Sequence, residues 1–190
     1  MTAPALRKDA ARNRQRILDA GRACVDQGTP IQLNDIARTA GVGVATVYRH
    51  FPTPQALTEA VAQATLESLA ATAEQALTCE DPWAALHDFL TTAVDAQLRD
   101  ASLSPVLAAP ETALPSTAEA RGHLTSLFGR LFARIEATGQ LAPGVTQADL
   151  TPLMCGVAFA ARMHPADTPD AQVAAGRHYL DIMLNGLRAR

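Results

Sequence analysis

Aromatic residues are rare in this sequence, at 4% of 190 residues, and cysteine occurs only three times. Strands favour aromatic and β-branched residues, whereas the prominent alanine and leucine favour helices, so the composition argues against a β-sheet protein. The cysteines are widely spaced, with no Cys-x-x-Cys pair, which is typical of the reducing cytoplasm rather than of a disulfide framework. No apolar run approaches the roughly 18 residues of a membrane span, and no apolar segment follows the basic N-terminus as in a secretory signal. We therefore expect a cytoplasmic, helical protein with no membrane partner.

The sequence also lacks the motifs of common enzyme and cofactor sites. It contains no nucleophile elbow, no glycine-rich phosphate loop and no pair of carboxylates at helical spacing in an apolar setting. Cys155 and His164 are too far apart for one face of a helix and have no third ligand near them, so no metal site is predicted. We expect neither catalysis nor a cofactor. An all-helical enzyme is the alternative that measured turnover would support.

Positive charge is concentrated at the N-terminal end, although the net charge of the whole chain is −3. Residues 1–52 contain eight Lys and Arg against four Asp, a net charge of +4, and residues 53–190 have a net charge of −7. Contacts with DNA phosphates require a basic segment of this kind. The charge distribution therefore favours a nucleic-acid contact within the first 52 residues.

Helix caps and breaks predict an all-helical chain of about nine helices. A cap residue followed by proline, typical of a helix start, occurs at Thr53-Pro54, Asp81-Pro82 and Thr168-Pro169. Thr146 and Asp149 have the spacing of a capping box. The predicted helices cover about residues 8–27, a segment capped by Gln32 or Asn34 and ending at residue 39, then residues 44–51, 54–77, 82–98, one short helix within 100–116, and residues 116–138, 146–163 and 169–187.

Residues 33–51 have the pattern of two short helices joined by a tight turn, a helix-turn-helix. Ala37 is small enough for the second helix to cross close to the first, and Gly41 can adopt the left-handed backbone that the turn requires. Ile36 and Val47 supply the apolar contact between the two helices. This arrangement predicts a second helix that enters the major groove of DNA.

The residues around this motif closely resemble the signature of the tetracycline-repressor (TetR) family of bacterial regulators. The resemblance covers about residues 10–60 and rests on Ile36-Ala37, Ala40-Gly41-Val42, Thr46 to Phe51, and Leu57. It implies a three-helix DNA-binding domain over residues 8–54, followed by a helical ligand-binding and dimerisation domain over residues 55–190. Two positions depart from the family pattern: Gly43 stands where serine is frequent, and Pro54 where lysine is frequent.

The resemblance also implies which residues of the recognition helix face the bases. Val44, Ala45 and Thr46 lie at its N-terminal end, where side chains meet base edges in the major groove. Ala45 and the methyl group of Thr46 would contact thymine methyl groups, while the Thr46 hydroxyl would reach a base or a phosphate. Arg49 is the one long donor of this helix and would also reach either of the two.

Further residues correspond to phosphate contacts. Tyr48 and His50 match positions that typically contact the DNA backbone, and Tyr48 can pack its ring at the same time. Thr53 would offer its N–H and hydroxyl to a phosphate at the start of the following helix. The first helix adds Arg12, Arg14 and Arg16, at least one of which is expected to contact the backbone.

The C-terminal part contains aromatic, histidine and methionine side chains that fit either a ligand pocket or an ordinary core. Pockets between helices are mainly apolar with a few polar groups, so composition alone does not separate the two. The candidate pocket residues are Trp83, His87, Phe89, Phe128, Met154, Phe159 and Met163. The ligand would be a small molecule whose identity the sequence does not disclose.

Apolar stripes on the last two predicted helices indicate packing against other helices. The stripes comprise Leu150, Leu153, Met154, Val157 and Ala161, then Val173, Tyr179, Leu180, Met183 and Leu187. Gly156, Ala158 and Ala160 would permit a close helix approach. In the TetR family the corresponding helices form a four-helix dimer interface, so the resemblance implies a homodimer on a near-palindromic operator.

We therefore expect a dimeric regulator of transcription, a repressor that a small-molecule ligand releases from its operator. The ligand must bind the released state more tightly than the DNA-bound state. The alternative is a helix-turn-helix regulator without a small-molecule ligand, either an activator or a protein-responsive regulator, which the absence of an enclosed cavity would favour.

Overall fold

The structure is a computed structural model that describes residues 3–189 and, from residue 8 onward, their side chains. The helices are α1 (Ala3–Asp26), α2 (Leu33–Ala40), α3 (Val44–His50), α4 (Pro54–Ala76), α5 (Pro82–Arg99), α6 (Leu103–Ala108), α7 (Pro115–Glu136), α8 (Gln147–Met163) and α9 (Pro169–Leu187). Within the described range the only β pairing is an isolated bridge between Leu141 and Arg188. The all-helical prediction is confirmed. Between residues 3 and 189, no helix is long and apolar enough to cross a membrane.

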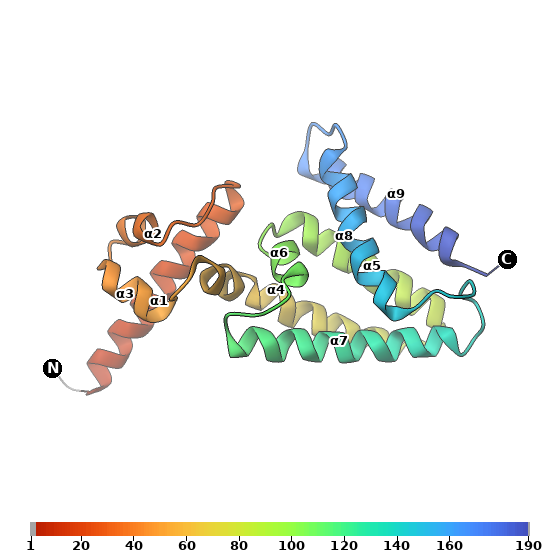
Figure 1. Cartoon of the computed structure of the whole chain (residues 1–190), viewed down its shortest axis with the longest axis horizontal. Helices are drawn as coiled ribbons and strands as arrows, with labels where there is room; N and C mark the ends of the chain where they lie inside the picture. Colours follow the sequence, from red (N-terminus) through yellow and green to blue (C-terminus); the bar gives the residue numbers. More distant parts are fainter. Residues whose placement is uncertain (1–2, 190) are drawn as a thin grey trace.

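Helices α1 to α3 form a unit at one end of an elongated molecule (Figure 1). The side chains buried in its core are Ile17, Ala20, Leu33, Ile36, Ala37, Ala40, Val47 and Phe51, together with Ala56, Leu57 and Val61 from the start of α4. The remainder of α4 contributes to the second core. The expected domain boundary between residues 54 and 55 therefore falls at the first turn of a helix that both cores share.

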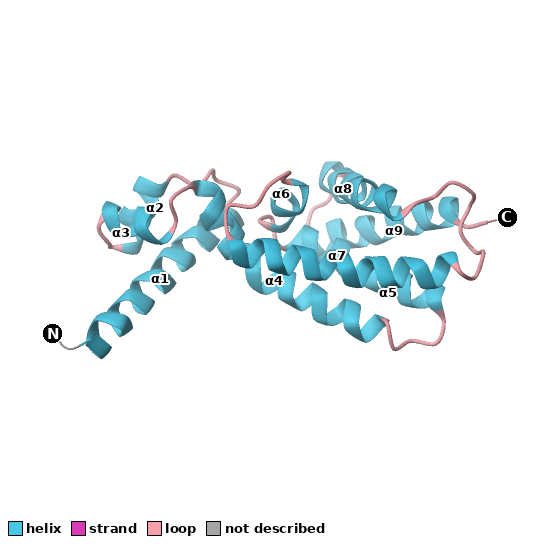
Figure 2. Cartoon of the chain, turned by 60° about the horizontal axis from the view of Figure 1, so that its bottom comes forward, coloured by secondary structure: helices cyan, strands magenta, loops and turns pink. Residues whose placement is uncertain are grey.

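The second core lies among α4 to α9. Figures 1 and 2 show α7 running alongside α4, while α8 crosses over the bundle and α9 packs beside α5 and α8. The fully buried leucine and isoleucine side chains here are Leu66, Leu86, Leu90, Leu103, Leu131, Ile135, Leu150 and Leu180. Burial of one such side chain stabilises the fold by about 2 kcal/mol, so most of the large buried side chains of the chain contribute through this bundle.

The close approach of α9 to α5 depends on Gly176. A Cβ atom at this position would lie 2.5 Å from Leu98 Cδ1 and 3.0 Å from Val94 Cγ1, both on α5. Such distances are well inside van der Waals contact. A larger residue at position 176 would therefore require the Leu98 side chain to change rotamer and Val94 to shift.

Local capping signals located most helix starts. Thr53 and Thr168 accept hydrogen bonds from the backbone N–H groups of Ala56 and Ala171, and Asp81 caps α5 in the same way. At α8, the Asp149 carboxylate accepts hydrogen bonds from the N–H and the hydroxyl of Thr146. Each pair satisfies N–H or hydroxyl groups that would otherwise have no partner at a helix end.

One expectation about helix starts was wrong, and another was confirmed in position only. The first helix begins at Ala3 rather than near residue 8, because residues 3–7 favour helix and proline is tolerated in a first turn. At α2, Gln32 occupies the cap position with an extended backbone but makes no side-chain cap bond, and Asn34 lies inside the helix. The start of α2 is fixed instead by burial of Leu33 and Ile36.

A buried carboxylate joins α4 to the start of α7. Glu59 is almost fully buried and accepts hydrogen bonds from the N–H groups of Ala113 and Leu114, at 2.7 and 2.9 Å. These residues directly precede α7, where unpaired N–H groups and the helix dipole favour a negative charge. Helices α4 and α7 are therefore held together at the end nearest the N-terminal unit.

Candidate functional site

The turn between α2 and α3 has the geometry that the sequence predicts. Gly41 ends α2 with φ of 60° and ψ of 43°, a left-handed backbone that favours glycine. The N–H of Val42 donates to the Ala37 carbonyl at 3.0 Å, which closes the turn. Ala37 and Val47 are buried between the two helices. This packing fixes the angle at which α3 leaves the N-terminal unit.

Helix α3 presents a mixed apolar and polar face to solvent. Val44, Ala45, Tyr48 and Arg49 are exposed, and the side chain of Tyr48 makes no hydrogen bond to any described residue. Thr46 and His50 are partly buried. All six residues expected at the DNA surface of this helix therefore lie at or near one accessible surface, whereas Val47 faces inward.

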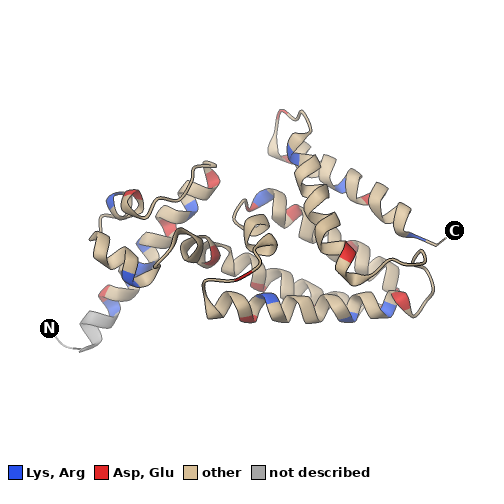
Figure 3. Cartoon of the chain, viewed as in Figure 1, with Lys and Arg blue, Asp and Glu red and all other residues tan. Residues whose placement is uncertain are grey.

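Besides Arg49 of α3, the basic residues expected at this surface belong to α1, whose ribbon is blue at its described Lys and Arg positions (Figure 3). The guanidinium of Arg14 lies 5.5 Å from the centre of the Phe51 ring, just after α3, and the Arg16 side chain reaches Gly41 in the turn. Arg12 lies nearer the N-terminal end of α1, and its guanidinium nitrogen is 3.8 Å from a carboxylate oxygen of Asp9. Arg14 and Arg16 are therefore adjacent to the helix-turn-helix, and Arg12 is more distant from it.

The start of α4 borders the same surface. Thr53 is exposed, and its side-chain oxygen is already used by the N–H of Ala56, at 3.1 Å. The hydroxyl remains able to donate outward because it accepts, rather than donates, this bond. Pro54 follows as the first helical residue and has no N–H to offer.

A cavity of about 310 Å³ opens inside the second unit between α4, α5, α6, α7 and α8. Among the candidate pocket residues, Phe89, Phe128 and Met154 line it, and the two phenyl rings lie 5.9 Å apart. Its polar lining was not anticipated from the sequence and consists of Gln97, Arg121, Thr125, Thr151 and Cys155. The lining contains one cationic side chain and no carboxylate.

Four other candidate residues lie outside this cavity. Trp83 packs at the end of the bundle under the guanidinium of Arg188, 4.7 Å from its ring centre. His87 points from α5 toward α9 rather than inward. Phe159 is 65% exposed and Met163 is 69% exposed on the outer face of α8. Helical spacing identified these side chains as apolar or amphipathic but did not show which face of each helix looks into the bundle.

His87 is surrounded by carboxylates. Its Nε2 lies 3.0 Å from Asp181 on α9 and its Nδ1 lies 3.1 Å from the neighbouring Asp88. The hydrogen bond to Asp181, and then that to Asp88, raise the pKa of His87 above its usual 6.5. Protonated His87 therefore forms an ion pair with Asp181 that links α5 to α9.

We expect this contact to make stability depend on pH. A raised folded-state pKa stabilises the fold fully below about pH 6.5, and the contribution disappears as pH rises through the folded-state value. The wild-type thermal midpoint should exceed that of His87→Asn by about 1–2 °C at mildly acidic pH, and the gap should close once pH has risen above the raised folded-state pKa. The effect is small because solvent screens an exposed pair. A gap that widens with pH, measured by thermal melts, would contradict this assignment.

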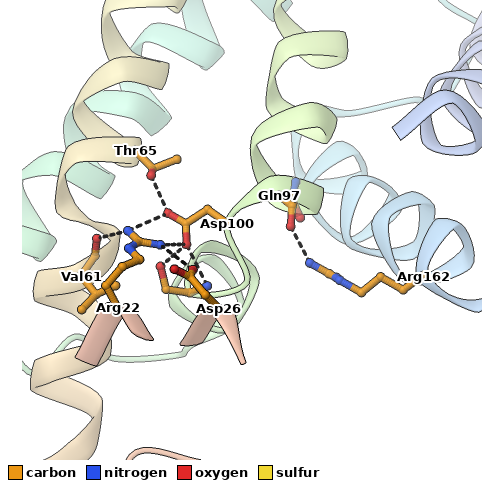
Figure 4. A network of polar contacts seen from close by, with 8 residues as sticks. Arg22, Asp26, Val61, Thr65, Gln97, Asp100 and Arg162 are labelled. Carbon is orange, nitrogen blue, oxygen red and sulfur yellow. Dashed lines mark hydrogen bonds and ion pairs between the residues drawn. The ribbon is translucent and has the colours of Figure 1, made fainter. Parts of the chain in front are cut away.

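A polar network joins the N-terminal unit to the end of α5 (Figure 4). Arg22 of α1 donates to the Asp100 carboxylate at 2.7 Å and to the Val61 carbonyl at 2.7 Å. Thr65 of α4 and Ser102 also donate to Asp100. Burial alone would raise the pKa of Asp100, but these hydrogen bonds and the Arg22 charge outweigh it and lower the pKa below its usual 3.8.

A second polar contact joins α8 to the same region. Arg162 donates to the backbone carbonyl of Gln97 at 2.5 Å and to the Ser104 hydroxyl at 3.2 Å. Gln97 lines the cavity, and Ser104 belongs to α6. The contacts of Arg162 therefore link α6 to α8 and to the cavity wall at Gln97. Asp100, just before α6, links the same region to the N-terminal unit through Arg22.

The exposed large apolar residues of the described chain fall into two groups. Val44 and Tyr48 belong to α3. The others, Leu153, Phe159, Met163 and Ile182, form what we call the α8–α9 patch. Exposed apolar surface marks an interaction site where it is contiguous over several hundred Å². Much of the predicted stripe, including Leu150, Met154, Val157 and Leu180, is buried within its own chain instead.

Comparison with protein families places both halves of the chain. Residues 17–61 match a family described as bacterial regulatory proteins of the tetR family. Residues 81–189, more than half of the chain, match the C-terminal domain of SbtR-like transcriptional regulators. The first match contains the helix-turn-helix, and the second contains α5 to α9.

Individual relatives agree with these matches. A TetR transcription regulatory protein of Mycobacterium vanbaalenii is 30% identical, over 97% of this chain and 99% of that one, with a TM-score of 0.50. The TetR transcriptional regulator SCO0520 of Streptomyces coelicolor is 29% identical, over 92% and 98% of the two chains, with a TM-score of 0.53. A curated helix-turn-helix regulator of Staphylococcus aureus is 34% identical over 80 residues, and the match spans only 42% of that protein.

Proposed function

This chain belongs to the TetR family of bacterial transcriptional regulators, and we propose that it is a homodimeric repressor that a small molecule releases from its operator. The cavity within the second unit is the observation that carries the ligand-released part of this proposal. It is open to the surface rather than enclosed, so it supports a ligand while a regulator without one stays the alternative. We assign residues 8–54 to DNA binding and residues 55–190 to ligand binding and dimerisation, with α4 contributing to both.

The exposed face of α3 supports the DNA-binding assignment. Val44, Ala45 and Thr46 begin the helix, and such N-terminal positions of a recognition helix face the bases. Tyr48, His50 and Thr53 are proposed to contact phosphates. Arg14 and Arg16 lie beside α3 and would add phosphate contacts, whereas Arg12 would do so only toward the edge of the site.

Arg49→Gln tests this surface. We expect operator affinity to fall about tenfold, because one charged donor to DNA is lost. A phosphate contact would reduce the slope of log affinity against log salt by about one, whereas a base contact would relax specificity at one position. Gel-shift titration against the DNA upstream of the gene for this chain measures both.

Arg130→Gln is the matched control, since Arg130 is an exposed arginine of α7 far from α3. It should leave operator affinity unchanged. Wild-type protein that shows no salt-sensitive, sequence-specific binding to the upstream DNA would refute the proposed function.

The α8–α9 patch supports the homodimer. Gly156 and Ala160 are exposed on the same face of α8 as Phe159 and Met163, and nothing lies within 4 Å of a Cβ atom placed at Gly156. Small residues between large apolar ones let two helix pairs approach closely. A twofold pairing of this patch would place two α3 helices on successive turns of a near-palindromic operator.

Release by a ligand requires that the cavity and the N-terminal unit be connected. Gln97 lines the cavity at the end of α5, and Asp100, three residues later, binds Arg22 of α1. A ligand that favours a different position of this end of α5 would alter both contacts. The coupling exists only if the ligand binds that state more tightly.

A further inference from the structure

The cavity is apolar except for donors that lack a partner. Nine of its lining side chains are apolar: Leu69, Phe89, Leu90, Ala93, Leu107, Leu124, Phe128, Leu150 and Met154. Its volume of about 310 Å³ lies at the small end of the range of about 300–1,000 Å³ for ligand pockets. A hydrocarbon or aromatic body of modest size fits such a lining, because its burial removes apolar surface from water.

Arg121 is the one charged residue of this lining. It projects from the first half of α7, is only partly exposed, and makes no hydrogen bond or ion pair with any residue that the structure describes. Arginines elsewhere in the bundle, such as Arg134 and Arg162, donate to backbone carbonyls. A guanidinium in a largely apolar cavity favours an anionic partner, and a carboxylate can accept two parallel hydrogen bonds from it.

Gln97 provides a second donor. Its residue is 2% exposed, and its Oε1 accepts a hydrogen bond from the Ser104 hydroxyl at 3.3 Å. Its amide Nε2 donates to no described residue, although the side chain lines the cavity. This amide nitrogen is not among the buried atoms without a partner, so solvent reaches it through the cavity, and a ligand oxygen would take the place of water there. Both donors therefore select for hydrogen-bond acceptors.

The mouth of the cavity shows how such a ligand would lie. Arg121 and Thr125 line the cavity and also a surface groove with Pro110, Glu111 and Thr112. The groove contains the Glu111 carboxylate, but the cavity lining contains no acid. A negative group is therefore favoured at Arg121, where the cavity meets the groove, and disfavoured further out.

We infer that the cavity binds an amphipathic carboxylic acid, with its apolar body between Phe89, Phe128 and Leu150 and its carboxylate on Arg121. This assignment rests on the proposed function, because it names the chemical class of the ligand. It excludes cationic drugs and purely neutral hydrocarbons as the preferred class. The predicted order of affinity is anion, then neutral molecule, then cation of the same chain length.

Decanoate, 1-decanol and decyltrimethylammonium test this order at constant chain length. Isothermal titration calorimetry of the wild-type chain should show decanoate binding about tenfold or more tightly than 1-decanol. Arg121→Gln should remove this advantage, whereas 1-decanol, which loses at most one neutral hydrogen bond, should bind the variant only a few-fold more weakly, and this retained binding shows that the cavity stays folded. Arg130→Gln, on the same helix but outside the cavity, should behave as wild type.

Hexanoate to hexadecanoate and 4-phenylbutyrate extend the test to other sizes. The inference is overturned if none of these acids binds saturably, if 1-decanol or the ammonium compound binds as tightly as decanoate, or if Arg121→Gln leaves decanoate affinity unchanged. Gel shifts without any acid test the proposed function separately. A chain that binds its operator but none of the acids would refute this ligand class alone.

Discussion

A Phe159→Asp variant is expected to be a folded monomer with operator affinity at least about 100-fold below that of the wild type. Phe159 is 65% exposed in the single chain, so the substitution removes little internal packing. In the proposed dimer it would place two carboxylates in an apolar interface, which costs several kcal/mol. A monomer binds one half-site at a time and loses the effective concentration of a linked pair, worth about 10²–10⁴ in affinity. Sedimentation and gel-shift titration measure the two effects.

Ala133→Asp is the matched control for this substitution. Ala133 is exposed on α7, away from the α8–α9 patch, and Arg130 one turn earlier accommodates the new charge. The control should remain dimeric and bind the operator as wild type does. A Phe159→Asp chain that stays dimeric, with unchanged helical circular dichroism, would place the dimer interface elsewhere.

Asp100→Asn is expected to lower the free energy of unfolding by about 2–3 kcal/mol. The variant removes the closer of two carboxylate partners of Arg22, leaving only Asp26 at 3.9 Å, and gives position 100 an amide N–H in place of a carboxylate oxygen. The loss is below that of a fully buried pair because about a third of the Arg22 side chain is exposed. Denaturant unfolding measures the difference. The exposed pair of Asp35 and Arg38 provides the control, since Asp35→Asn should cost at most about 1 kcal/mol.

The pH dependence of this loss gives a second readout. The pKa of Asp100 is lowered in the fold, so its contribution is present above the unfolded value of 3.8 and disappears as pH falls through the folded value. The stability difference between wild type and Asp100→Asn should therefore be constant from about pH 5 to 8 and should shrink in stronger acid. A difference that grows on acidification would exclude the carboxylate as its source.

Local signals explain why so much of the fold was predictable. A cap followed by proline located α4, α5 and α9, because a threonine or aspartate oxygen and a fixed proline φ act within four residues. The helix-turn-helix was predictable for the same reason, since Ala37, Gly41 and Val47 satisfy one short-range geometry. Where the cap was weak, at Gln32, packing rather than sequence fixed the boundary.

The cavity and the outer patch were less predictable because they depend on tertiary contacts. Helix α8 is apolar on two sides, with Met154 facing the cavity and Phe159 facing outward. Periodicity shows that both residues are apolar but does not show which side the chain itself covers. The sequence around Arg121 and Gln97 does not distinguish them from other surface or core residues. They became candidates for ligand binding only because the fold places both in the cavity lining with a hydrogen-bond donor that no described residue accepts from.

Under the proposed function, helix α4, which both cores share, would act as a lever between them. Its 23 residues span about 34 Å, and a tilt of about 5° at its far end displaces the first turn by about 3 Å, close to the axial spacing of one base pair. Glu59, near the first turn of α4, accepts hydrogen bonds from the residues that precede α7. This contact joins α7, which lines the cavity, to the end of α4 that would be displaced. In a twofold dimer the two displacements are opposed, so the recognition helices would separate or converge by about 6 Å. An operator repeat of about 34–36 Å leaves little tolerance for such a misregistration.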